Sequence, residues 1–182
     1  EDLTTPLPED DLCTRAAYAL QKATGCSSGA HIAIAKSIPA EAGMGGGSSD
    51  AATCLIGLNR LWQTGLDQNQ LCSIGLKLGA DVPFFIKGKN AWVEGVGQFI
   101  TPIELPEAHF LVIKPHKGLS TKDIFSAKDL KRNTKSATLA VFAEQLDDPY
   151  DYGRNDMQAV AERLCPEISD VIHLMSQMGL KG

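Results

Sequence analysis

The most informative stretch of this chain reads Pro39-Ala40-Glu41-Ala42-Gly43-Met44-Gly45-Gly46-Gly47-Ser48-Ser49-Asp50-Ala51-Ala52. Its four glycines have no Cβ, so the backbone can turn tightly and come close to a ligand. Two serines follow where an apolar helix pattern begins, and at a helix start free N–H groups and the helix dipole favour an anion. The stretch therefore predicts a loop that binds phosphate through its backbone.

Two familiar glycine loops are excluded. A Walker A loop needs a Lys after its last Gly, and no Lys occurs between Lys36 and Lys77. A dinucleotide fingerprint needs a third Gly where this chain has Ser48, and an acidic residue about 20 positions later. A simple Gly/Ser linker is disfavoured, because the stretch follows an alternating strand pattern and ends in an apolar helix.

Composition narrows the class of protein. With 182 residues, 43% hydrophobic and 21% charged, the chain can bury one substantial core or two small ones. A net charge of −5 without a basic run argues against nucleic acid as a partner. Phosphate binding is therefore expected to come from backbone groups and a metal ion. The four scattered histidines lack metal-ligand spacing, and we assign no metal-binding residue.

Cysteine usage and the terminal segment bear on the compartment. Five cysteines without a C-x-x-C pair favour a reducing cytoplasm. No apolar run approaches about 18 residues, and residues 1–6 lack the features of a signal peptide. We expect a cytoplasmic protein without a membrane partner.

Hydrophobic periodicity and turn residues predict the secondary structure. Helices are expected from Asp10 or Asp11 to Thr24, at 48–63, from Asp67 to Leu78, and at 121–127, 136–145, 155–164 and 166–178; strands are expected at 30–36, 82–86, 91–94, 98–101 and 110–113. Because strands and helices do not alternate strictly, the fold class is α+β. The stretch 119–136 is the expected domain junction.

A second candidate feature is Asp81, within Gly79-Ala80-Asp81-Val82-Pro83-Phe84-Phe85. Taken alone, an Asp in a turn before a proline most often makes local backbone hydrogen bonds. Beside a nucleotide loop, a carboxylate at the start of the expected strand could accept or orient a hydroxyl proton during phosphoryl transfer.

The glycine-rich loop, with its pattern Pro-x-x-x-Gly-Met-Gly-Gly-Gly-Ser-Ser, resembles the phosphate loop of the GHMP kinases. The Asp81 segment, Glu94-Gly95-Val96-Gly97 and Ser120-Thr121-Lys122-Asp123-Ile124-Phe125 narrow the resemblance. They are similar to the branch of the family that phosphorylates a cytidyl diphosphate sugar-alcohol in the non-mevalonate isoprenoid pathway. The similarity runs over almost all of the chain.

This resemblance implies a two-domain GHMP kinase fold with the active site in the cleft between the domains. Residues 1–118 would be the ATP-binding domain, lacking its first strands, and 119–182 a truncated C-terminal domain. Asp81 would be catalytic, magnesium would accompany ATP, and Thr121 and Phe125 would bind the substrate, with Phe125 stacked on cytosine. The residues expected at ATP are Lys36 near the adenine and, around the phosphates, Pro39, Ala40, Glu41, Ala42, Gly43, Met44, Gly45, Gly46, Gly47, Ser48 and Ser49.

Three departures qualify the resemblance. The family's phosphotransfer Lys, in an upstream Pro-Ala-Lys motif, and its later Gly-Ser-Gly segment are both absent, so we expect a fragment. Asp11 stands where the family usually has Asn near the adenine. Alternative interpretations are a GHMP kinase for homoserine or mevalonate, a GHMP-type decarboxylase, and a nucleotide-binding module without catalysis. For Phe125 the alternative is core packing, and for Lys36 it is a solvated strand end.

Overall fold

The computed structural model describes residues 10–39, 42–144 and 149–180. The chain divides into two compact units, residues 1–104 and 105–182. The domains predicted from the sequence, 1–118 and 119–182, place their boundary further along the chain, and that assignment stays a prediction.

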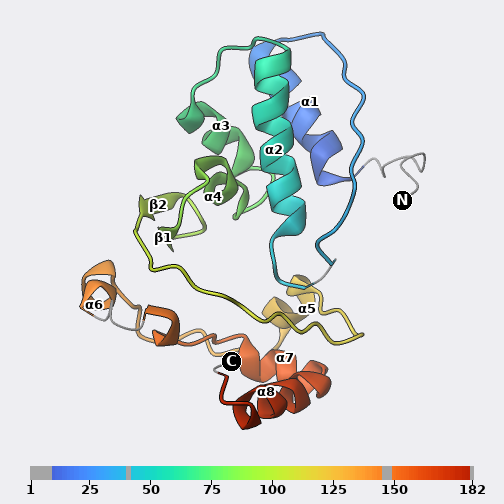
Figure 1. Ribbon diagram of the computed structural model, residues 1–182. Coiled ribbons are helices and arrows are strands. Elements are labelled where there is room, and N and C mark those ends of the chain that lie inside the picture. The colour runs from blue at the N-terminus through green and yellow to red at the C-terminus, as the bar shows by residue number, and fades with distance from the viewer. Residues whose placement is uncertain (1–9, 40–41, 145–148, 181–182) are drawn as a thin grey trace. The chain divides into compact units, whose positions relative to one another are not determined.

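The first unit consists of helices followed by a β-hairpin (Figure 1). Its described elements are α1 (Leu12–Thr24), α2 (Gly46–Leu61), α3 (Gln68–Gly75), α4 (Val82–Lys87), β1 (Ala91–Glu94) and β2 (Phe99–Pro102).

Helix ends in this unit follow from local side-chain chemistry. The Asp11 carboxylate accepts a hydrogen bond from the Cys13 N–H at 2.8 Å and begins α1, and Gly25, in the left-handed conformation, ends it. Asp67 and Gln70 form a capping box at the start of α3. The helices predicted at these places are confirmed, as is the one in α2.

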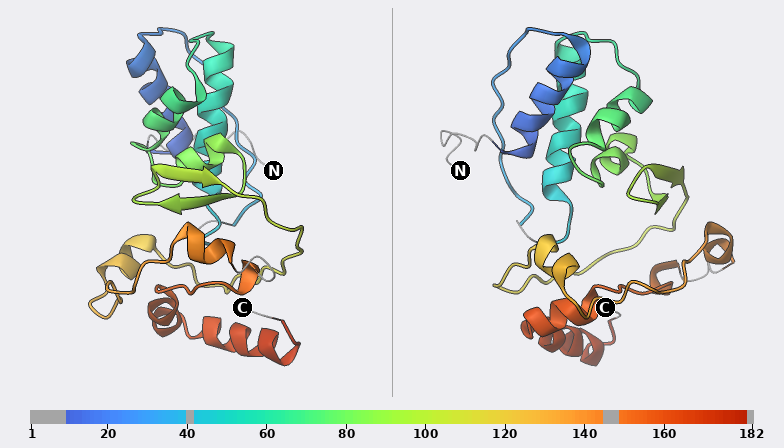
Figure 2. Two further views of the ribbon diagram at one scale, coloured as in Figure 1. Left: turned by 90° about the vertical axis from the view of Figure 1, so that its left-hand side faces the viewer. Right: turned by 180° about the vertical axis from the view of Figure 1, so that it is seen from behind.

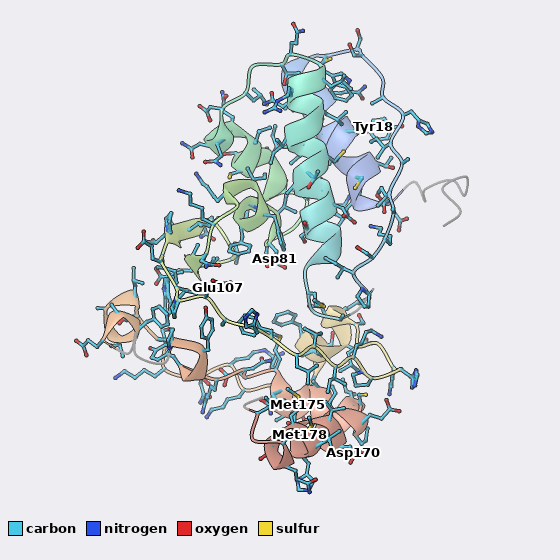
Figure 3. All side chains as sticks on the ribbon, viewed as in Figure 1. Tyr18, Asp81, Glu107, Asp170, Met175 and Met178 are labelled. Carbon is cyan, nitrogen blue, oxygen red and sulfur yellow. The ribbon has the colours of Figure 1, made fainter. Side chains whose placement is uncertain are left out.

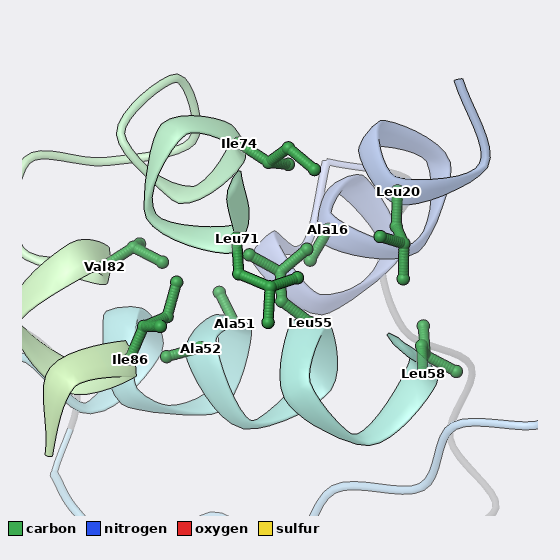
Figure 4. Packing of buried hydrophobic residues seen from close by; sticks show 10 residues of the cluster. All are labelled: Ala16, Leu20, Ala51, Ala52, Leu55, Leu58, Leu71, Ile74, Val82 and Ile86. Carbon is green, nitrogen blue, oxygen red and sulfur yellow. The ribbon is translucent and has the colours of Figure 1, made fainter. Parts of the chain in front are cut away.

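The core of the first unit lies between the four helices, and α2 contacts each of the other three (Figure 4). Helix α2 contributes four buried side chains spaced along one face, as its apolar periodicity predicts. The buried cluster comprises Ala16, Leu20, Ala51, Ala52, Leu55, Leu58, Leu71, Ile74, Val82 and Ile86.

The prediction of a strand at Val82–Ile86 is wrong, because this segment forms α4. A short apolar run has no period that separates a strand from a buried helix. Pro83 lies in the first turn of α4, where its fixed φ suits a helix and its missing N–H costs nothing. Gly88 then ends the helix in the left-handed conformation.

Two other predicted strands are also wrong. Residues 30–36 and 110–113 are not part of any strand in the described chain. Ile32 and Ile34 are still half-buried while their neighbours are exposed, so the alternation indicated burial correctly. At 110–113 the apolar side chains are exposed, although a buried strand was expected. A strand requires a hydrogen-bonded neighbour, and the described residues offer none to either segment.

The hairpin of the first unit is confirmed, with β2 shifted by one residue (Figure 2). Its strands are antiparallel and pair Ala91 with Pro102 and Glu94 with Phe99. Residues 95–98 connect them.

The second unit is built from short helices. They are α5 (Thr121–Ser126), α6 (Leu139–Ala143), a 3₁₀ turn at Pro149–Asp151, α7 (Gln158–Leu164) and α8 (Glu167–Gln177). All four predicted helices occur here, and α6 is shorter than expected; the predicted end of that helix, Gln145, lies outside the described residues. Val160 and Cys165 are buried, and Arg163 forms an ion pair with Asp129 at 2.8 Å. No helix among the described residues is both long and apolar enough to cross a membrane.

Candidate active site

The N-terminus of α2 lies where the glycine-rich loop ends. Gly45 is its N-cap, and in the described part of the chain no side chain caps it. The Ser49 N–H donates to the Gly45 carbonyl at 2.9 Å, the first bond of the helix. The N–H groups of residues 46–48 precede that bond and have no partner inside the helix. Sixteen residues of aligned peptide dipoles lie behind these groups, so the helix start can receive a phosphate.

Gly45 also connects the loop to α4. Its φ of 67° lies in the left-handed region, which an L side chain occupies only with strain. A Cβ placed there would lie 2.8 Å from two carbons of the Phe85 ring. The ring of Phe85 therefore packs directly on the loop backbone, and only glycine fits at position 45.

The segment before α4 lies beside the start of α2. A Cβ at Gly79 would be 3.8 Å from the Ser48 hydroxyl oxygen and 3.5 Å from Val82. Residues 79–81 then turn into α4, with the Val82 N–H donating to the Gly79 carbonyl at 3.2 Å. The structure thus brings together the two sequence motifs singled out above, the glycine loop and the Asp81 segment.

Asp81 is the N-cap residue of α4 and is exposed (Figure 3). Its side chain makes no capping hydrogen bond, and within the described residues it has no ion-pair partner. The prediction that it stands at the start of a strand is wrong, since a helix begins there. The alternative of a carboxylate committed to local backbone bonds is not what the structure has. An exposed carboxylate without a partner is available to a ligand.

Lys36 contacts the same helix from the preceding segment. Its Nζ lies 2.5 Å from the Asp50 carboxylate, in the second turn of α2. The hydrogen bond that the Lys36 ammonium donates to the Asp50 carboxylate raises the pKa of Lys36, so the ammonium is held in its charged form beside the loop. Lys36 does not end a strand, because none forms there in the described chain.

The remaining loop residues differ in their exposure to solvent. Pro39, Gly43 and Met44 are exposed and Ala42 is half-buried. Ala40 and Glu41 lie outside the described residues. The part of the loop before Gly45 is therefore largely exposed to solvent.

The two residues predicted to bind substrate lie on α5, in the second unit. Thr121 and Phe125 are one helical turn apart and so share a face of this helix. Phe125 is 56% exposed, which excludes core packing as its role within the described residues. Its carbonyl accepts a hydrogen bond from the Arg132 guanidinium at 2.6 Å.

Sequence reasoning missed Phe85 and Asp50 as parts of this site. Phe85 belongs to the quoted Asp81 segment. A large aromatic side chain in a segment expected beside the glycine-rich loop could have been suspected of packing against that loop. Asp50 directly follows the two serines, but no sequence signal pairs it with Lys36, which lies 14 residues earlier.

Comparison with known proteins identifies the class of this site. Residues 11–89, which contain the loop, α2 and the Asp81 segment, match the N-terminal domain of the GHMP kinases. The chain belongs to the GHMP kinases, and the mixture of helices and strands expected of that fold is confirmed.

Relatives within the family carry one name. A protein of Paracidovorax citrulli named 4-diphosphocytidyl-2-C-methyl-D-erythritol kinase is 56% identical over all of this chain and 64% of its own length. A protein of Variovorax paradoxus with the same name is 55% identical, over all of this chain and 66% of its own length. A crystal structure of 4-(cytidine 5'-diphospho)-2C-methyl-D-erythritol kinase superposes with a TM-score of 0.75 at 33% identity, over 98% of this chain and 66% of that one. The chain thus spans about two thirds of the length of these relatives.

Proposed function

We propose that the full-length protein transfers the γ-phosphoryl group of ATP to the 2-hydroxyl of 4-diphosphocytidyl-2-C-methyl-D-erythritol. The observation that carries the proposal is the start of α2, with N–H groups that have no partner inside the helix, beside an exposed, unpaired carboxylate, Asp81. The names of the relatives support the substrate, and the cytoplasm remains the expected compartment.

The proposed chemistry is an in-line displacement. The substrate oxygen forms a bond to the γ-phosphorus while the bond from that phosphorus to the β–γ bridging oxygen breaks, and ADP leaves. Asp81 takes the proton from the attacking hydroxyl. The N–H groups of residues 46–48 hold phosphate oxygens and offset their negative charge, so the chain acts mainly by positioning and by electrostatics.

The proposed ATP site rests on the backbone of residues 39–49, with Lys36 on the adenine side. Magnesium, when bound, neutralises charge between the phosphates. Magnesium prefers oxygen ligands. The Ser48 hydroxyl, at the start of α2, is the protein oxygen that would reach it.

The proposed acceptor site lies on α5. An exposed aromatic ring can stack on a base, and Phe125 offers one to cytosine. Thr121, on the same face, offers a hydroxyl to the same ligand.

The test is steady-state kinetics on the full-length enzyme with saturating ATP. Asp81→Asn should lower kcat by about 10²–10⁴-fold and leave ATP affinity nearly unchanged, because the amide keeps the shape and loses the base. Asp170→Asn, which removes an exposed carboxylate from α8, is the matched control and should behave as wild type. A fall in kcat of less than about threefold in Asp81→Asn would rule out a catalytic role for Asp81. If the wild-type enzyme phosphorylated homoserine or mevalonate better than the cytidyl substrate, the proposed substrate would be wrong and only membership of the GHMP kinases would stand.

A further inference from the structure

The turn of the β-hairpin contains a buried glycine in an otherwise exposed segment. Residues 93–96 and 98–99 are exposed, whereas Gly97 is buried. Its φ is 100°, and its N–H donates to the Glu94 carbonyl at 3.4 Å. Atoms from another segment of the chain therefore shield this glycine from solvent.

The covering group is the peptide that leads into Asp81. A Cβ at Gly97 would lie 2.1 Å from the carbonyl oxygen of Ala80 and 2.9 Å from its carbonyl carbon. That carbonyl belongs to the peptide bond joining Ala80 to Asp81. The two backbones are thus in direct contact, and a side chain at position 97 would occupy the place of the Ala80 oxygen.

The contact matters because it restrains the backbone on the exposed side of Asp81, whereas Val82 on the other side is held in the core. Ala80 and Asp81 are both exposed. The nearby backbone bonds are long, at 3.2 Å from the Val82 N–H to the Gly79 carbonyl and 3.3 Å from the Phe85 N–H to the Asp81 carbonyl. A turn packed against the preceding carbonyl limits the rotation of the 80–81 peptide, and this peptide affects the direction of the Asp81 side chain.

We propose that Gly97 is a positioning residue that holds Asp81 in the orientation needed for phosphoryl transfer. The inference rests on the catalytic role proposed for Asp81 and extends the active site to the hairpin. Gly97 itself touches no reacting atom, so its effect should appear in kcat and not in the binding of ATP.

The expected effect of Gly97→Ala follows from the distance. An ordinary contact between a carbon and a carbonyl oxygen is about 3.3–3.6 Å, whereas the new methyl would lie 2.1 Å from the Ala80 oxygen. The two groups must therefore separate by about 1.2–1.5 Å. A misplacement of about 1 Å in a reacting group can cost about 10²-fold in rate. We therefore expect kcat of the full-length enzyme to fall about 10²-fold, with the ATP KM nearly unchanged.

Gly65→Ala is the matched control. Gly65 also has a left-handed φ, 70°, but nothing lies within 4 Å of the position of its Cβ. The variant also places an alanine at positive φ, but without the clash, so its melting temperature should fall while kcat stays near wild type. If both variants lose kcat in proportion to their loss of melting temperature, the positioning role is overturned.

The double variant Gly97→Ala/Asp81→Asn separates positioning from general damage. If Gly97 acts through Asp81, adding Gly97→Ala to Asp81→Asn should cause no further loss of kcat. Multiplicative losses would overturn the inference and leave the role of Asp81 intact. An active Asp81→Asn enzyme would instead refute the catalytic role proposed for Asp81, and the inference with it.

A second variant serves if Gly97→Ala does not fold. The Gln98 side-chain oxygen accepts a hydrogen bond from the Val96 N–H at 2.6 Å and so stiffens the turn. Gln98→Ala removes this bond at an exposed position without adding an atom. It should lower kcat by several-fold in wild type and have no effect in the Asp81→Asn background; an unchanged kcat in wild type would count against the inference.

Discussion

The contact between Gly45 and Phe85 gives the sharpest test of how the fold builds the phosphate site. Gly45→Ala introduces two penalties at once. An alanine in the left-handed region costs about 1–2 kcal/mol. In addition, its Cβ would lie 2.8 Å from the Phe85 ring, whereas carbon atoms pack at about 3.5–4.0 Å. The ring or the loop must therefore move by about 1 Å.

Movement of the loop should be visible as lost affinity for ATP. The N–H groups of residues 46–48 follow Gly45 directly, so a shift there turns them away from the phosphates. If the displaced loop costs about 1.4–2.8 kcal/mol in binding, the Kd for ATP rises about 10–100-fold. A fluorescent ATP analogue titrated into the folded full-length protein measures this, with a thermal melt on the same preparation.

Gly43→Ala separates the clash from the strain. Gly43 has nearly the same φ, 69°, but nothing lies within 4 Å of its Cβ position. It should therefore share the strain and show the smaller loss of affinity. Adding Phe85→Leu to Gly45→Ala removes the ring and should recover part of the binding. Unchanged ATP affinity in Gly45→Ala, or no recovery in the double variant, would refute the reasoning.

Three other predictions concern the acceptor, an ion pair and the core. Phe125→Ala should raise the KM for the cytidyl substrate about five- to hundredfold, since stacking on a base is worth about 1–3 kcal/mol, and leave the ATP KM unchanged; equal changes in both constants would contradict it. Lys36→Met should lower the free energy of unfolding, measured by urea denaturation, by at most about 1 kcal/mol, because the ion pair between Lys36 and Asp50 is partly exposed. The raised pKa of Lys36 means that this contribution is complete below the ordinary value of 10.5 and disappears as the pH rises through the folded-state pKa; a difference that persists there would exclude the ion pair as its cause. Gly75→Ala should destabilise the first unit by about 1–3 kcal/mol, because its Cβ would lie 2.7 Å from Val82 in the core; a melting temperature equal to wild type would argue against that packing.

Local signals in the sequence determined much of this protein. The caps of α1 and α3 depend on side chains within a few residues of the helix ends, so Asp11, Gly25 and Asp67 could be recognised without any fold. The glycine-rich loop before α2 was predictable for the same reason, since its glycines and the helix start are adjacent in the chain. The proposal that this loop binds phosphate rests on that adjacency.

Tertiary structure decided what these signals could not. The run Val82–Ile86 became a helix because its apolar side chains pack against α2 and α3, and period alone does not separate the two states. Residues 30–36 kept the alternating burial of a strand without a neighbour to pair with in the described chain. The contacts of Gly45 with Phe85 and of Gly97 with Ala80 join segments distant in sequence. Only packing brings such segments together, because steric exclusion acts between atoms close in space regardless of their order along the chain.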